Sequence, residues 1–293
     1  MNNINQHFVL NDGRQLGYAT YGSKNDFPII YCHGSQSSRI EMHYDMSFAI
    51  ENGLRIITVD RPGHGLSDFN PKGSILGFAD DIKQLTEHLK IDKFSVAGMS
   101  AGSPFALAIA HQFPEQVQKT AIISGFAPFN SESKKLLTME VKLMLNLAKY
   151  FPWLLKMMLS IQDKQLKKKP KKALQGFLKI MSSPDQEILK NDLVMNIIIR
   201  MFNEAFRQGS KGVAYEISNL LVKDWKFKLS DIQVPVKFWQ GKKDNNVPFE
   251  WAELMTKEIK NADIKLFQEE GHLIIFQHAK EIFTELKPNI TKQ

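Results

Sequence analysis

FSVAGMSAG, residues 94–102, joins a short apolar run to a helical pattern that extends to Gln112. The run predicts a buried strand, and the pattern predicts a helix directly after it. Between them stands the pentapeptide Gly98-Met99-Ser100-Ala101-Gly102. Such a strand-to-helix turn holds a serine hydroxyl clear of the backbone, and its glycines let neighbouring chain approach closely. We therefore predict that Ser100 is a nucleophile; the alternative is a structural Gly-Ser turn.

A serine nucleophile requires a base, and the base requires an acid that orients it. Among the eight histidines, His272 follows a predicted strand over 263–268. Asp244 follows a predicted strand over 234–239. Both residues therefore fall at carboxyl ends of strands, where open α/β sheets place their sites. We predict a catalytic triad of Ser100, Asp244 and His272.

The alternation of apolar runs and helical patterns extends along most of the chain. Apolar strands separated by helices predict a parallel sheet covered on both faces. A hairpin is predicted over 7–22, around Asn11-Asp12-Gly13. The predicted strands cover 28–32, 55–59, 94–98, 120–124, 234–239 and 263–268, and the predicted helices cover 39–52, 78–90, 101–112, 249–260 and 273–287.

This alternation stops between Gly125 and about Leu229, where helical patterns prevail and few runs resemble strands. We interpret the segment as a helical cap inserted into the α/β domain. The predicted division is a core domain of residues 1–126 and 229–293 and a cap domain of residues 127–228.

The positive charge of the chain is concentrated in this predicted cap. The formal net charge is +7, whereas residues 127–228 hold 19 Lys and Arg against 9 Asp and Glu. Lysines are densest over 164–172, without the interleaved aromatic residues of a platform for single-stranded nucleic acid. We expect a solvated lysine-rich surface rather than a nucleic-acid or anionic-membrane patch, and no nucleic-acid partner.

Apolar side chains are also frequent in the predicted cap. They are expected either to form the cap's own core or to line an adaptable acyl or alcohol pocket. The candidates are Met139, Met144, Met157, Met158, Met181, Met195, Met201, Phe151, Trp153, Leu154, Phe177, Phe202 and Phe206.

Three features of the sequence predict where the protein is located. The first seven residues lack the features of a signal peptide. The most apolar span, 136–161, is interrupted by Pro152 and three lysines, so we expect no stable membrane insertion. A single cysteine, Cys32, fits a reducing compartment, which favours the cytoplasm.

No metal-ligand spacing and no nucleotide-binding glycine loop is present, so we expect neither a metal nor another cofactor.

Four separated motifs resemble the cap-bearing serine branch of the α/β-hydrolase superfamily. They are His33-Gly34, Asp60-Arg-Pro-Gly-His-Gly-Leu-Ser67, the turn at Ser100, and the loops of Asp244 and His272. The resemblance covers about residues 7–125 and 230–287, and the order serine, aspartate, histidine is that of the superfamily. It implies an α/β fold with an eight-stranded, mostly parallel sheet flanked by helices, and a helical cap.

The resemblance also implies roles for residues around Ser100. The backbone N–H groups of Ser35 and Ala101 are expected to form the oxyanion hole. His33 and Gly34 would shape that loop, with His33 bracing it rather than transferring protons. Gly98, Met99 and Gly102 would support the turn. One departure is Gln36-Ser37-Ser38, because many relatives have proline or glycine two residues after the His-Gly pair.

The loop over 60–67 is expected to form the floor beside the site. For its Arg61, His64 and Ser67 we favour a structural role over substrate contact. Relatives that dehalogenate or open epoxides use an aspartate nucleophile, so a serine at position 100 argues against both activities.

These features predict a serine hydrolase that cleaves carboxylic esters or thioesters of small to medium hydrophobic substrates through an acyl-enzyme. Its partner would be a small-molecule acyl substrate, and monomer and homodimer both stay open. Alternatives with the same triad are a proline-releasing aminopeptidase, a carbon–carbon bond hydrolase and a cofactor-free perhydrolase. A non-catalytic receptor on the same fold is an alternative of another class.

Overall fold

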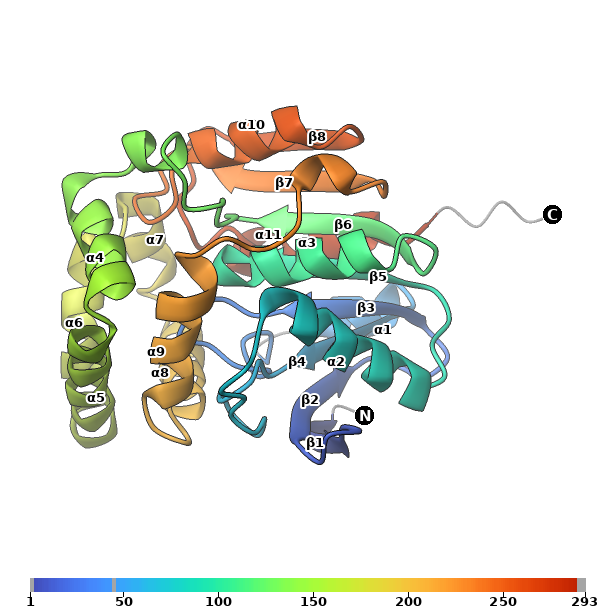
Figure 1. The fold of residues 1–293 in the computed structure, drawn as a ribbon, viewed down its shortest axis with the longest axis horizontal. Coiled ribbons are helices and arrows are strands. Elements are labelled where there is room, and N and C mark those ends of the chain that lie inside the picture. Colours follow the sequence, from blue (N-terminus) through green and yellow to red (C-terminus); the bar gives the residue numbers. More distant parts are fainter. Residues whose placement is uncertain (1–2, 44–45, 289–293) are drawn as a thin grey trace.

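An eight-stranded sheet in the order β1-β2-β4-β3-β5-β6-β7-β8 forms the centre of the computed structural model, which describes residues 3–43 and 46–288 (Figure 1). The strands from β4 to β8 in this order run parallel, and β2 is antiparallel to both β1 and β4. The predicted eight-stranded, mostly parallel sheet is therefore confirmed. The strands are β1 Asn3–Val9, β2 Gln15–Tyr21, β3 Phe27–Cys32, β4 Leu54–Val59, β5 Phe94–Met99, β6 Val117–Ile123, β7 Val236–Gly241 and β8 Ala262–Phe267.

The predicted hairpin is formed by β1 and β2 around Gly13, which has a positive φ of 87°. Its backbone N–H donates to Leu10 O at 2.9 Å, and Leu10 N donates to Arg14 O at 2.8 Å. Glycine adopts this left-handed conformation without steric cost, which explains why the chain reverses there.

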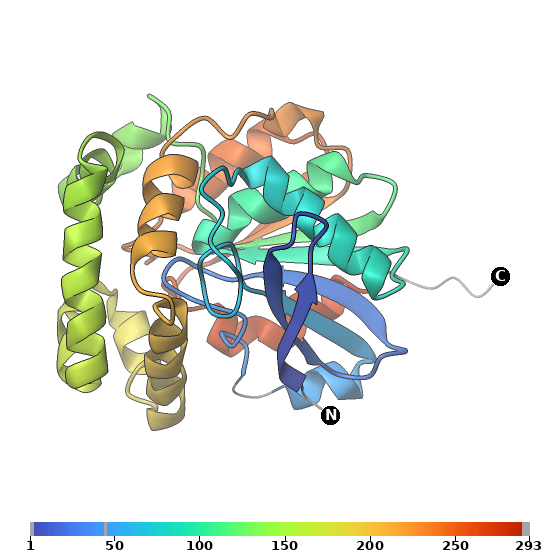
Figure 2. The same ribbon diagram turned by 60° about the horizontal axis from the view of Figure 1, so that its bottom comes forward.

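Helices cover both faces of the sheet, as the apolar strands require. Every residue of β4 and of β5 is buried. Helices α2 Ile75–His88, α3 Ser103–Gln112 and α10 Phe249–Glu258 cover one face, and α1 Ser47–Glu51 and α11 Ile275–Glu285 cover the other (Figures 1 and 2). The sheet thus lies between two helical layers, with the main core on each side of it.

The helix predicted over 39–52 is wrong in its first half. Residues 39–42 form turns, residues 44–45 lie outside the described part of the chain, and α1 begins only at Ser47. The backbone of Arg39 bonds elsewhere: its N–H donates to Asp60 Oδ1 at 2.6 Å, and its carbonyl accepts from Thr58 Oγ1 at 2.5 Å. These buried bonds hold Arg39 in the loop that follows β3.

Between β6 and β7 the described chain contains helices and no strand. We call residues 139–221 the helical segment. It stands at the end of the sheet toward which the parallel strands point (Figures 1 and 2). Proline occupies the first turn of α5, α6 and α7, where a missing N–H costs nothing. Its elements are α4 Met139–Tyr150, α5 Pro152–Lys168, α6 Pro170–Ile180, α7 Ser183–Ile188, α8 Asp192–Ala205, α9 Lys211–Tyr215 and a π-helix, η3 Glu216–Leu221.

Three short 3-10 turns complete the fold: η1 Ser100–Gly102, η2 Ser133–Leu136 and η4 Leu229–Asp231. Across residues 3–43 and 46–288, no helix combines the length and apolar character needed to cross a membrane. The same residues contain no group of three or more His, Cys, Asp or Glu side chains able to hold a metal ion.

Candidate active site

A cavity of about 830 Å³ lies between the carboxyl ends of the strands and the helical segment. The nucleophile candidate Ser100 and the base candidate His272 both line it. So do Ser35 and Ala101, the residues expected to supply the oxyanion hole. The fold thus brings residues from the ends of β3, β5 and β8 to one wall, and the helical segment supplies most of the rest.

Ser100 lies directly after β5, in a backbone conformation that L-residues avoid. Its φ is +51°, and this left-handed region costs a residue with a Cβ roughly 1–2 kcal/mol. Hydrogen bonds to its carbonyl oxygen hold the turn: Ser103 Oγ donates at 2.7 Å and Phe126 N at 3.2 Å. The turn is therefore strained and fixed from both sides.

The two glycines of the pentapeptide are required by close packing. A Cβ at Gly102 would lie 2.1 Å from Cys32 O, and one at Gly98 would lie 2.7 Å from Ala106 Cβ. No side chain fits at either position without moving the backbone or helix α3. The glycines thus let helix α3 begin directly against β3 and β5.

His272 and Asp244 form a buried hydrogen-bonded pair. His272 Nδ1 donates to Asp244 Oδ2 at 2.7 Å. The second carboxylate oxygen accepts from Asn246 N at 2.8 Å and Val247 N at 2.9 Å, and Gln240 Nε2 donates to Oδ2 at 3.0 Å. These bonds fix the carboxylate, which in turn fixes the imidazole with its proton on Nδ1 and leaves Nε2 free of that proton.

The pKa of His272 is raised above its ordinary value of 6.5. Burial acts first and lowers it, because a charged imidazole loses solvation. The negative charge of Asp244 and its hydrogen bond outweigh burial, and Asp185 and Glu41 add further negative charge. The pair therefore stabilises the imidazolium that forms when His272 accepts a proton.

Asp185, from helix α7, was not identified from the sequence. Its carboxylate is fully buried and accepts from the backbone N–H groups of His272 (3.0 Å) and Leu273 (2.8 Å). Ser182 Oγ donates to the same carboxylate at 2.6 Å. A single acid in a helical pattern has no distinguishing neighbours, so no sequence signal pointed to it. The helical segment thus holds the loop that carries the candidate base.

The loop after β3 lies against Ser100. A Cβ at Gly34 would stand 3.8 Å from Ser100 Cβ. Gly34 N donates to the buried Glu41 at 3.0 Å, and Tyr31 OH donates to the same carboxylate oxygen at 2.7 Å. Burial raises the pKa of Glu41, and these hydrogen bonds oppose the increase. Glu41, which also lines the cavity, is a second residue that the sequence did not single out.

His33 is enclosed by backbone. Its Nδ1 donates to Gly34 O at 2.8 Å, and its Nε2 accepts from Arg61 N at 3.2 Å. Burial, together with the nearby Arg61 charge, lowers its pKa well below 6.5, so the ring stays neutral. His33 does not line the cavity, and its geometry favours bracing over proton transfer.

Arg61 connects the loop after β3 to the helical segment. Its guanidinium donates to the carbonyl oxygens of His33 and Gly34, the latter at 2.9 Å. It also pairs with Glu216 of η3 at 2.5 Å and 2.9 Å, and both side chains are buried. No residue of the loop over 60–67 lines the cavity, so the structure does not show the floor that was expected there. For Arg61, His64 and Ser67 this agrees with the expected structural role.

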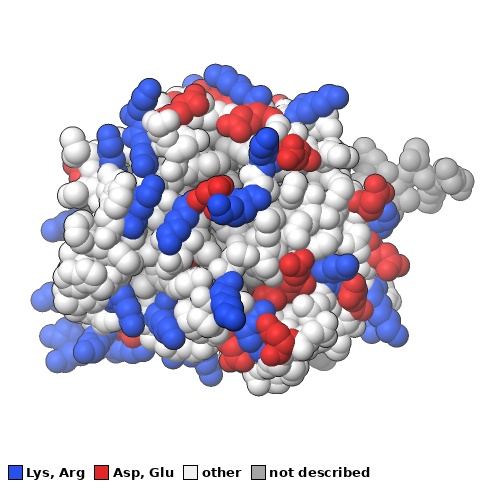
Figure 3. Space-filling model, viewed as in Figure 1, with Lys and Arg blue, Asp and Glu red and all other residues white. Residues whose placement is uncertain are grey.

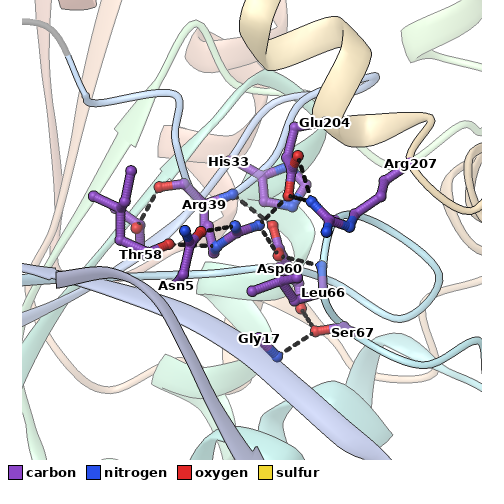
Figure 4. Close-up of polar contacts among 12 residues, drawn as sticks. Asn5, Gly17, His33, Arg39, Thr58, Asp60, Leu66, Ser67, Glu204 and Arg207 are labelled. Atoms are coloured by element: carbon purple, nitrogen blue, oxygen red, sulfur yellow. Dashed lines mark hydrogen bonds and ion pairs between the residues drawn. The ribbon is translucent and has the colours of Figure 1, made fainter.

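A second buried network surrounds Arg39 (Figure 4). Its guanidinium donates to Asp60 at 2.8 Å, to Glu204 of α8 at 2.7 Å and to Asn5 of β1 at 2.5 Å. Asp60 Oδ2 also accepts from Leu66 N at 2.8 Å. One side chain therefore joins the first strand, the loop over 60–67 and the helical segment.

Gln36 has a positive φ of 52° in the loop after β3. Its side chain lines the cavity beside Ser35. The stretch Gln36-Ser37-Ser38 thus begins with a left-handed backbone conformation.

Some apolar residues of the predicted cap line the cavity and others are buried in the core, so both expectations apply to part of the set. Met144, Met158, Met201 and Phe202 line the cavity. Met181 and Phe206 are buried away from it, whereas Met139, Phe151, Trp153 and Met157 are exposed. Leu154 and Met195 are half-buried, and the side chain of Phe177 lies outside the described part.

Comparison with known proteins shows which family the chain resembles. A family model described as "alpha/beta hydrolase fold" matches residues 28–279. The chain is 28% identical to the uncharacterized hydrolase YcgS of Bacillus subtilis, over 90% of each chain. It is 25% identical to the 2-hydroxy-6-oxononadienedioate/2-hydroxy-6-oxononatrienedioate hydrolase of Burkholderia vietnamiensis, over 93% of this chain and 90% of that one. An esterase from Exiguobacterium antarcticum has a similar structure, with a TM-score of 0.67, 22% identity, and coverage of 96% of this chain and 97% of that one.

Proposed function

This chain belongs to the alpha/beta hydrolase family, and from that premise we propose that it is a serine hydrolase that cleaves carboxylic esters or thioesters of small to medium hydrophobic substrates. Ser100 is the nucleophile, His272 the general base and Asp244 the acid that orients it. The reaction proceeds through an acyl-enzyme and uses no cofactor.

One observation carries this proposal: a strained serine and a histidine that is bonded to a buried aspartate line the same, mostly apolar cavity. Ser100 has a φ of +51°, and His272 Nδ1 lies 2.7 Å from Asp244 Oδ2. Ser100 and His272 both line the cavity. A receptor would not need to maintain a strained serine beside a buried base, because such strain is usually kept where function uses it.

The acylation step follows from the direction of the hydrogen bonds. Because Nδ1 of His272 donates to Asp244, Nε2 is available to accept the Ser100 proton. The serine oxygen attacks the acyl carbon, and His272 passes the proton to the departing alcohol or thiol. A water molecule, deprotonated by the same histidine, then releases the acid and restores Ser100.

The tetrahedral oxyanion would be bound by the backbone N–H groups of Ser35 and Ala101. Gly98, Met99 and Gly102 support the turn that carries Ala101, and His33, Gly34 and Arg61 fix the loop that carries Ser35. Preorganised donors of this kind are each worth about 3–4 kcal/mol of transition-state stabilisation.

The helical segment would act as a cap domain, within residues 127–228, over a core of residues 1–126 and 229–293. Its apolar lining supports a hydrophobic acyl or alcohol group, since Leu145, Leu155, Leu159, Ile198 and Phe202 line the cavity. We also propose a cytoplasmic location, supported by the single, fully buried cysteine Cys32.

One alternative activity has an observation in its favour. An aminopeptidase needs acidic groups to hold the substrate ammonium, and Glu41 and Glu140 both line the cavity. Glu41 is already engaged by Tyr31 and Gly34, which weakens this alternative. Comparing hydrolysis of p-nitrophenyl acyl esters with that of proline p-nitroanilide separates the two activities.

The triad is tested by Ser100→Ala, with the exposed Ser230→Ala as the matched control. We expect Ser100→Ala to abolish fluorophosphonate labelling and ester turnover, because no other hydroxyl would be activated by His272. Ser230→Ala should retain both. Wild-type turnover by Ser100→Ala would refute the assignment, and an unlabelled wild-type protein would indicate a binding protein.

A further inference from the structure

We propose that the outward face of helices α4 and α5 docks onto an anionic lipid surface, from which amphiphilic acyl esters enter the cavity. The docking stands independently, whereas the delivery of esters rests on the proposed function. The sequence alone favoured a solvated lysine-rich surface here. The structure changes that expectation, because apolar side chains as well as lysines face outward on these helices.

The outward face of these two helices is apolar. Ten of the thirteen large hydrophobic side chains that are exposed in the described residues fall between Leu136 and Ile161. Helices on a protein surface usually turn polar residues outward, so this concentration marks an interaction site. On α4 the outward side chains are Met139 (76% exposed), Leu143 (67%) and Tyr150 (62%); on α5 they are Trp153 (66%), Met157 (49%) and Ile161 (49%).

Lysines border this face. Residues 139–180 contain ten lysines and two acidic residues, so their net charge of +8 exceeds that of the whole chain. On α5, Lys164 and Lys168 continue at helical spacing the row that begins with Trp153, Met157 and Ile161. Figure 3 shows blue side chains along the left and lower-left edge, where α4, α5 and α6 lie, with white surface between them.

The cavity opens on the same face. Leu143, Met144, Met158 and Ile161 are about half exposed or more, and all four also line the cavity that contains Ser100. A hydrophobic chain leaving a lipid layer could therefore pass from the docked face to the nucleophile without crossing water.

A lipid surface fits this face better than the other occupants. A second copy would set two strongly positive faces against each other. Nucleic acid would satisfy the lysines but leave the Met and Leu side chains without partners. An anionic bilayer surface offers phosphates to the lysines and an apolar layer to Trp153 and its neighbours, as for helices that lie in the membrane interface.

Vesicle flotation with the Ser100→Ala protein tests the docking without lipid hydrolysis. We expect binding to phosphatidylcholine vesicles that contain phosphatidylserine, weak binding to pure phosphatidylcholine, and loss of binding at high salt. A triple variant in which Lys164, Lys168 and Lys171 are all replaced by Gln should bind anionic vesicles with a partition coefficient roughly 100-fold lower than that of the parent protein. Lys226→Gln, an exposed lysine outside these helices, is the control and should change it little.

The apolar part is tested by Trp153→Gln and Met157→Gln, with the exposed Ile50→Gln of α1 as the matched control. Both helix variants should weaken vesicle binding, and the control should not. Equal binding to neutral and anionic vesicles, no binding, or a dimer in sedimentation that Trp153→Gln dissociates would each overturn the proposal. Vesicle binding without ester turnover by the wild type would instead refute the proposed function alone.

Discussion

Ser100 combines the proposed nucleophilic role and backbone strain in one residue. Its positive φ of 51° directs the side chain out of the turn, and its Cβ makes that conformation unfavourable. The hydrogen bonds that Ser103 Oγ and Phe126 N donate to its carbonyl hold the conformation against this cost.

We predict that Ser100→Gly is more stable than Ser100→Ala by about 1 kcal/mol, because only alanine retains the Cβ that opposes a positive φ. Both variants should be inactive. Urea unfolding of the two proteins at neutral pH measures the difference. Equal stability of the two variants would show that the turn is not strained.

At the scale of elements, helix α7 holds the loop between β8 and α11 in place through hydrogen bonds. Asp185 accepts from two successive N–H groups of that loop, at His272 and Leu273, across 87 and 88 residues of sequence. A Cβ at Gly271 would lie 2.3 Å from the Asp185 carboxylate, so this loop needs glycine to approach α7 so closely.

We predict that Asp185→Asn moves the acid limb of the kcat/KM profile to lower pH. In the proposed mechanism His272 acts as a base only when it is neutral, so activity should rise with pH through its pKa, which is raised above the ordinary 6.5. Removing the negative charge of Asp185 lowers that pKa. Asp244→Asn should move the limb further in the same direction and reduce kcat by about 10⁴-fold.

The matched control is Asp192→Asn, which removes an exposed acid of helix α8. Its pH profile should equal that of the wild type. An unchanged acid limb in Asp185→Asn, whatever its kcat, would restrict Asp185 to a structural role.

At the scale of the whole molecule, buried charges join the helical segment to the sheet. Arg39 bonds to Asn5, Asp60 and Glu204, which come from three separate parts of the chain. Arg61 and Glu216 form a second buried connection. The walls of the cavity are thus held in place by ion pairs that water scarcely reaches.

We predict that Arg39→Gln lowers the free energy of unfolding by about 3–5 kcal/mol, because it leaves a buried carboxylate without its charge partner. Arg207→Gln is the matched control: it removes another arginine from Glu204, but one that is 55% exposed, and should cost less than about 1 kcal/mol. Urea unfolding measures both. If Arg39→Gln is too unstable to purify, Arg39→Lys should fall between them; similar values for Arg39→Gln and Arg207→Gln would contradict the prediction.

The α/β class, the succession of strands and helices along the chain and the position of the turn at Ser100 could all be predicted from the amino-acid sequence. These features depend on local signals: apolar runs that only a buried strand satisfies, helical spacing, and glycines beside a serine. The sequence also predicted that Asp244 and His272 follow strands. In the folded chain Asp244 Oδ2 lies 2.7 Å from His272 Nδ1.

Which other residues support the candidate site, and which surfaces remain exposed, became visible only in the folded molecule. Asp185, Glu41 and Glu216 meet their partners across loops and helices, and such pairing leaves no periodic pattern in the chain. The start of α1 was missed for the same reason, because Asp60 holds the backbone of Arg39 outside a helix. In α4 and α5 apolar residues occupy both faces, so periodicity could not distinguish inside from outside; packing against the rest of the molecule did.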